Sequence, residues 1–145
     1  MGLRIGLSVF LAAFAADLGT KGAVVAAHVP GIYFNTPRHG LPLRLVMCGV
    51  AVGIAMLMTR AAAWRGLGRP WGAWIGGGLL VGGVLANGVS PLLWHAGVPD
   101  WIVNGDWIGN VADFEIFFGL TGGFVSLAIG ACVVYARETI ASRRA

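Results

Sequence analysis

Two aspartates near the end of an apolar run are the residues of this chain best suited to chemistry. Asp100 lies in residues 97–102, a segment rich in Gly, Pro and Trp that offers no helix to cap. Asp113 follows Asn110 by three residues, and it can also be explained as the acid of a capping box. Two carboxyl groups held close together share a proton and divide the roles of general acid and general base. The two aspartates together therefore indicate a chemical role more strongly than either aspartate does alone.

A second ionisable pair lies inside the first apolar run. Asp17 and Lys21 are four residues apart, so on a helix they share one face and neutralise each other. Ionisable groups at membrane depth are costly unless they are paired or hydrated. We expect this pair to face the interior of a helix bundle, either as part of a polar site or as a contact that orients the first helix.

The composition places these residues in a membrane protein. Hydrophobic residues make up 57% of the 145 residues, charged residues 11%, and the mean hydropathy is +0.80, which excludes an ordinary soluble domain. At about 20 residues per span, we predict an all-α integral membrane protein. It has a single domain, 1–145, with four transmembrane helices at about residues 5–27, 42–59, 71–88 and 110–135.

The connecting segments carry the orientation signal. The expected cytoplasmic loop 60–70 and tail 136–145 hold most of the arginines. The outer side, with the expected extracytoplasmic loops 28–41 and 89–109, has only Arg38 and Arg44. Under the positive-inside rule both termini are cytoplasmic, and Asp100 and Asp113 lie on the outer side. The net charge of +4 is therefore interpreted as a topology signal, not as a nucleic-acid site. The outer loops form a small β-like region, in which residues 32–34 are the one strand expected.

Five segments, in order, resemble the motifs of the lipoprotein signal peptidase family (signal peptidase II). Residues 17–21 (DLGTK) are similar to the family motif D-x-x-T-K, and residues 29–31 with 35–36 are similar to P-G and N-T-G. Asn87 matches the asparagine of G-N-x-x-D-R. Residues 97–102 (GVPDWI) are similar to G-x-V-x-D-F-I, and residues 110–113 (NVAD) are similar to F-N-V-A-D. The resemblance covers about residues 9–135. Because the order and spacing of the motifs match as well, it indicates a divergent member of this family.

The resemblance implies an aspartic intramembrane endopeptidase in the bacterial cytoplasmic membrane. Such an enzyme removes signal peptides from diacylglyceryl-modified prolipoproteins, cutting just before the lipidated cysteine. Asp100 and Asp113 would be the catalytic dyad. The residues that bind substrate or support the dyad would be Asp17, Lys21, Asn35, Asn87 and Asn110. No metal or organic cofactor is implied, and the expected partners are the lipidated precursor and membrane lipids, with the protein acting as a monomer.

Two segments depart from the family pattern. Ser90-Pro91 stands where the family has Asp-Arg, and a more basic loop follows Asn35, so that Arg38 or Arg44 is left to supply the missing cation. Three functions therefore stay open. The chain is an active peptidase of divergent type, a non-proteolytic relative that binds lipidated peptides, or a small four-helix transporter or structural protein in which Asp17 and Lys21 form a substrate or proton site.

Overall fold

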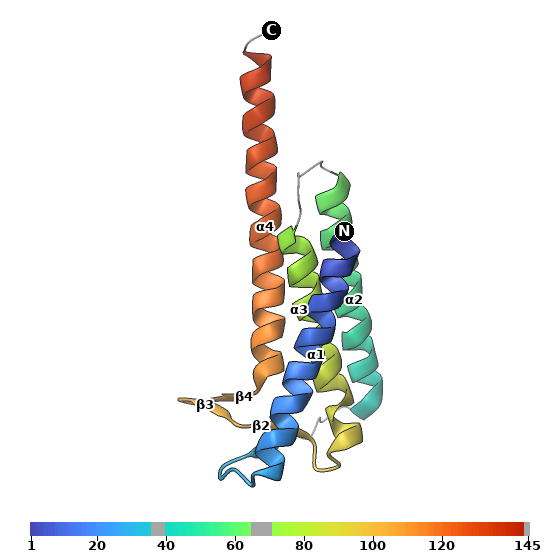
Figure 1. Ribbon diagram of the computed structural model, residues 1–145, viewed down its shortest axis with the longest axis vertical. Helices are drawn as coiled ribbons and strands as arrows, with labels where there is room; N and C mark the ends of the chain where they lie inside the picture. Colours follow the sequence, from blue (N-terminus) through green and yellow to red (C-terminus); the bar gives the residue numbers. More distant parts are fainter. Residues whose placement is uncertain (36–39, 65–70, 144–145) are drawn as a thin grey trace.

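Four long helices make up most of the described part of the chain (Figure 1). The computed structural model describes residues 1–35, 40–64 and 71–143. The helices are α1 (Gly2–Ala26), α2 (Gly40–Trp64), α3 (Trp71–Leu93) and α4 (Val111–Ser142). Each contains a stretch long and apolar enough to cross a membrane, as the composition predicts.

The helices continue beyond the apolar spans predicted from the sequence. Residues 60–64, 89–93 and 136–142, expected in a loop or in the tail, are helical. Apolar runs indicate which part of a helix suits a bilayer, whereas the helix ends depend on caps and on residue propensity. The extensions of α2 and α4 are rich in Ala, Arg and Glu, which are good helix formers.

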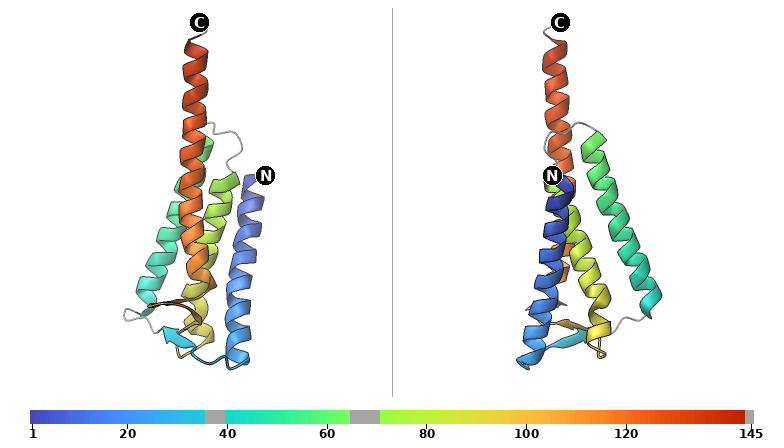
Figure 2. Two further views of the ribbon diagram at one scale, coloured as in Figure 1. Left: turned by 90° about the vertical axis from the view of Figure 1, so that its left-hand side faces the viewer. Right: turned by 45° about the vertical axis from the view of Figure 1, so that its right-hand side comes forward.

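α3 is the central helix, and three consecutive glycines let the other helices approach it. A Cβ on Gly76 would lie 2.6 Å from a backbone oxygen of α4, and one on Gly78 would lie 2.6 Å from a backbone oxygen of α1. Gly77 faces Ala55 of α2, whose Cβ would lie 3.2 Å away. Successive residues of a helix point about 100° apart, so each of these glycines faces a different neighbour. Figure 2 shows the resulting arrangement around α3.

Among the described residues, four short strands lie at the end of the bundle opposite the two termini (Figure 1). β1 (Tyr33–Asn35) pairs antiparallel with β2 (Val98–Asp100), and β3 (Ile102–Asn104) forms a hairpin with β4 (Trp107–Gly109). The expectation of a single strand was therefore wrong. The missed strands are three residues each, and β2 pairs with a partner more than 60 residues away, so tertiary pairing outweighs their loop-like composition.

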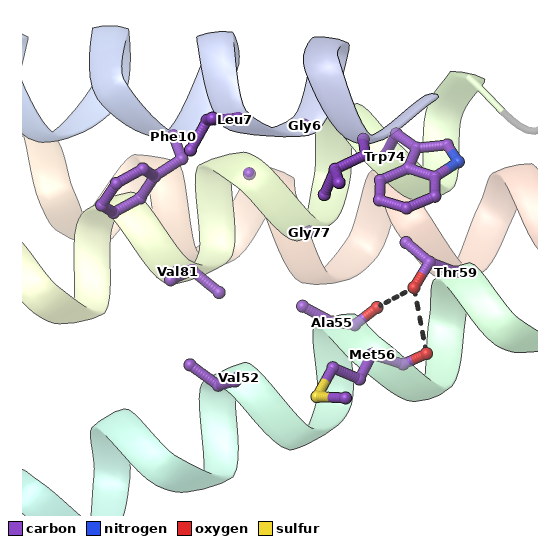
Figure 3. Close-up of a pocket in the computed structure, with 12 residues that line it drawn as sticks. Gly6, Leu7, Phe10, Val52, Ala55, Met56, Thr59, Trp74, Gly77 and Val81 are labelled. Atoms are coloured by element: carbon purple, nitrogen blue, oxygen red, sulfur yellow. Dashed lines mark hydrogen bonds between the residues drawn. The ribbon is translucent and has the colours of Figure 1, made fainter. Parts of the chain in front are cut away.

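An apolar groove of about 270 Å³ lies between α1, α2 and α3, toward the end that carries the termini. Figure 3 shows its lining, which includes Phe10, Met56, Trp74 and Val81. The Thr59 hydroxyl donates within its own helix, to the carbonyl oxygens of Ala55 and Met56 at 3.0 Å. None of the described residues that line this groove is titratable, and the groove is separate from the polar site described next.

Candidate functional site

The strands and the start of α4 bring Asp100 and Asp113 to the same cavity. Asp100 is the last residue of β2, only 4% exposed, and lies opposite Tyr33 in the β1–β2 register. Asp113 lies in the first turn of α4. The cavity, of about 250 Å³, is mostly polar and is lined by both aspartates. Its other lining residues are Asn35, Arg44, Asn87, Val98, Trp107, Ile108 and Asn110.

Asn110 connects the two carboxyl groups. Its side-chain Nδ2 donates to Asp100 Oδ1, and its backbone N–H donates to Asp113 Oδ2 at 2.9 Å. The residue is 1% exposed and immediately precedes α4. One buried asparagine at a helix start therefore fixes the position of both acids.

The surroundings of Asp100 favour its protonated form. Burial raises the pKa of Asp100 above its ordinary value, and the neighbouring charge of Asp113 raises it further. Hydrogen bonds from Asn110 and Asn35 and the charge of Lys21 act in the opposite direction, and burial is the largest effect. Asp100 is therefore suited to hold a proton while a neighbouring carboxylate acts as a base.

Asn87 of α3 connects Asp113 to the buried ion pair. Its Nδ2 donates to Asp113 Oδ1 at 3.1 Å, and its Oδ1 accepts a hydrogen bond from Lys21 Nζ at 2.6 Å. Since both ends of the amide are used, its orientation is fixed by the two partners. The polar network thus runs from α1 through α3 to α4.

Asp17 and Lys21 form an ion pair that is fully buried. Lys21 Nζ lies 2.5 Å from Asp17 Oδ2, and both side chains are 0% exposed. Lys21 also donates to Ser90 Oγ at 3.1 Å, while Asp17 Oδ1 accepts the Ala112 N–H at 2.9 Å. The pair therefore holds α1 against the first turn of α4, which carries Asp113.

The segment that departs from the family pattern contributes to this network. Ser90 is fully buried, and its hydroxyl donates to the Ala86 carbonyl at 2.7 Å while it accepts from Lys21. Arg44 of α2, one of the two candidate cations, lines the cavity and donates through Nη1 to the Asn87 carbonyl at 2.6 Å. Arg38, the other candidate, lies outside the described residues.

The structure brings together all seven residues singled out in the sequence. Six of them form one hydrogen-bonded group, which consists of Asp17, Lys21, Asn87, Asp100, Asn110 and Asp113. The seventh, Asn35, is exposed and forms a hydrogen bond to Asp100 from β1.

Glu115, which is 8% exposed and one turn along α4 from Ala112, was not identified from the sequence. The signal was present, since an acid inside an apolar span is by default a functional candidate.

Some buried side-chain atoms in the described part of the chain have no hydrogen-bond partner there. Among the described residues, the buried side-chain atoms without a hydrogen bond are Arg44 Nε, Asn110 Oδ1 and Glu115 Oε2. Two of these three residues line the cavity. Buried polar atoms are normally paired, so such atoms indicate a place for water or for a ligand.

No group of three His, Cys, Asp or Glu side chains in residues 1–35, 40–64 and 71–143 is arranged to hold a metal ion. The polar side chains that line the cavity carry two carboxyl groups, three amides and a guanidinium.

Comparison with protein-family models, with curated proteins and with solved structures found no match to this chain.

Proposed function

We propose that this protein is an aspartic endopeptidase of the lipoprotein signal peptidase type. Its substrate is a diacylglyceryl-modified precursor, which it cuts just before the lipidated cysteine. The observation that carries the proposal is the Asn110 bridge, which holds Asp100 and Asp113 in one polar cavity. The resemblance of residues 17–21, 97–102 and 110–113 to the family motifs adds the substrate class.

The proposed reaction is hydrolysis by a carboxyl pair that shares one proton. Asp113, as carboxylate, takes a proton from water while the water oxygen attacks the scissile carbonyl carbon. Asp100, whose protonated form is favoured by its burial, donates its proton to the carbonyl oxygen. When the tetrahedral intermediate collapses, the C–N bond breaks and the proton on Asp113 passes to the leaving amine. One hydroxyl of the intermediate returns its proton to Asp100 as the new carboxyl group forms.

The proposed setting is a bacterial cytoplasmic membrane with both termini in the cytoplasm. Four helices with both termini at one end support this orientation (Figure 1). Among the described residues, Arg4, Arg60, Arg137 and Arg143 belong to the end of the bundle that carries the termini, as the positive-inside rule requires of the cytoplasmic end. The strands and the aspartate pair would then meet a precursor arriving from the export machinery on the outer side.

The test is cleavage of a synthetic precursor peptide bearing a diacylglyceryl cysteine, with the full chain in proteoliposomes. Asp100→Asn and Asp113→Asn should each lower kcat/KM by about 10²- to 10⁴-fold, since an amide neither accepts the proton of water nor holds the shared proton. Asp106→Asn is the control. Asp106 is exposed in the β3–β4 turn and belongs to the same outer region, and this variant should keep its activity.

Two outcomes would contradict the proposal. If the wild-type protein binds the lipidated peptide but never cleaves it, the non-proteolytic relative is the correct interpretation. If either dyad variant cleaves at a rate near that of the wild type, the aspartic mechanism is wrong for this chain.

A further inference from the structure

Pro91 leaves one backbone carbonyl of α3 without its usual donor. In an α-helix the N–H of residue i donates to the carbonyl of residue i−4, and proline has no N–H. Pro91 lies inside α3, so the carbonyl that loses this donor is that of Asn87. Arg44 takes the vacant position, because its Nη1 donates to the Asn87 oxygen at 2.6 Å.

Asn87 therefore holds two functional groups in the cavity at once. Its side chain donates to Asp113, and its backbone carbonyl binds the guanidinium of Arg44. Arg44 lines the same cavity as Asp100 and Asp113, and a guanidinium has five N–H donors, so most of them are left for other partners. Its Nε finds no hydrogen-bond partner among the described residues.

We propose that Arg44 binds a carbonyl oxygen of the substrate in this cavity, and that Pro91 positions Arg44 by leaving the Asn87 carbonyl free. The inference rests on the function proposed above. An uncharged carbonyl suits the site better than an anion, because the acid pair that lines the same space carries a negative charge and would repel a negative ligand. The carbonyl belongs either to the peptide backbone or to an ester of the attached lipid, which offer the same acceptor.

The contact between Pro91 and Arg44 is tested first without substrate, by a double-mutant cycle in unfolding. Arg44→Gln should raise the unfolding equilibrium constant of the otherwise unaltered protein about 10-fold, the effect of losing a charged hydrogen bond. In a Pro91→Ala background the same change should have less than about a 3-fold effect, because the new N–H at position 91 serves the Asn87 carbonyl. Arg60→Gln, exposed on the same helix, is the matched control and should have no effect. Equal effects of Arg44→Gln in both backgrounds would overturn the role of Pro91.

The second test is the split between KM and kcat in cleavage of the diacylglyceryl precursor. Arg44→Gln should raise KM about 10-fold with kcat nearly unchanged, and Arg44→Lys should lie between it and the wild type because it keeps a charge and a donor. Pro91→Ala should raise KM as well, and the double variant should be no worse than Arg44→Gln. Pro30→Ala, in an exposed loop, controls for the loss of a proline. A fall in kcat at constant KM, or additive effects on KM, would contradict the proposal.

A precursor with ether-linked alkyl chains distinguishes the two sources of the carbonyl. If Arg44 binds a lipid ester, Arg44→Gln will not alter the KM of the ether substrate, whereas a backbone carbonyl will preserve the 10-fold effect. Wild-type protein that cleaves neither substrate would overturn the proposed function and the ligand assigned to Arg44. The coupling between Pro91 and Arg44 is judged separately by the unfolding cycle.

Discussion

Replacing Lys21 by Met should destabilise the bundle strongly, and replacing its partner as well should restore part of the loss. Lys21 is the only lysine of the chain, and its Nζ makes three hydrogen bonds, to Asp17, Asn87 and Ser90, at 2.5, 2.6 and 3.1 Å. Lys21→Met leaves the carboxylate of Asp17 buried without its counter-ion. Breaking a buried pair in this way costs about 3–5 kcal/mol of unfolding free energy.

The double variant Asp17→Asn/Lys21→Met removes both charges and keeps an acceptor for the Ala112 N–H. It should recover at least about 2 kcal/mol of the loss, because neutral groups need no counter-ion. The measurement is unfolding in mixed micelles by titration with a denaturing detergent, with Arg137→Met, exposed on α4, as the control. A cost below about 1 kcal/mol for Lys21→Met, or strictly additive single effects, would refute the buried ion pair.

Three further predictions follow from the site and the packing. The hydrogen bond from Asn35 lowers the pKa of Asp100, so its loss in Asn35→Ala should raise that pKa and move the alkaline limb of the kcat/KM profile to higher pH. An alkaline limb that stays in place or moves to lower pH would contradict this. Gly119→Ala should cost about 1–3 kcal/mol of unfolding free energy, since its Cβ would lie 2.5 Å from the Leu80 nitrogen, whereas Gly122→Ala, with open space, should change stability little. A cysteine at Asp106, in a protein lacking Cys48 and Cys132, should react with impermeant thiol reagents only from outside, and one at Glu138 only from the cytoplasm; the reverse pattern would rule out the proposed orientation.

The helices could be predicted from the sequence because each apolar run is about as long as a span, and the pair Asp17 and Lys21 could be placed on one face from its spacing alone. That the two aspartates meet could not be derived from spacing. Asp100 and Asp113 are 13 positions apart in a segment with no helical or alternating period. Their residue type, their shared outer side and the motif resemblance suggest a pair, but none of these fixes the distance between them. Their approach depends on the β1–β2 pairing and on the Asn110 bridge, both of which are tertiary contacts.

The contact between Arg44 and the Asn87 carbonyl could not be predicted from the sequence either. The sequence shows that Pro91 removes an N–H, but not whether the apolar run continues as a helix through it, since a proline more often ends or kinks a helix. α3 does continue to Leu93, and only then does the freed Asn87 carbonyl become a definite acceptor. Which of Arg38 and Arg44 reaches it depends on how α2 packs against α3. That packing is set by close contacts such as that between Gly77 and Ala55, which composition does not reveal.

The structural and the chemical explanations of Asp113 are compatible, because its two oxygens do different things. Oδ2 accepts the Asn110 N–H, as the acid of a capping box does, while Oδ1 accepts the amide of Asn87 and belongs to the polar network. Asn110 also takes part in both the helix start and the acid pair. Its backbone N–H donates to Asp113 just before the first residue of α4, and its side-chain nitrogen donates to Asp100. The start of α4 therefore sets the geometry of the acid pair, and a variant that loosens this helix start should weaken the proposed catalysis even if both aspartates are retained.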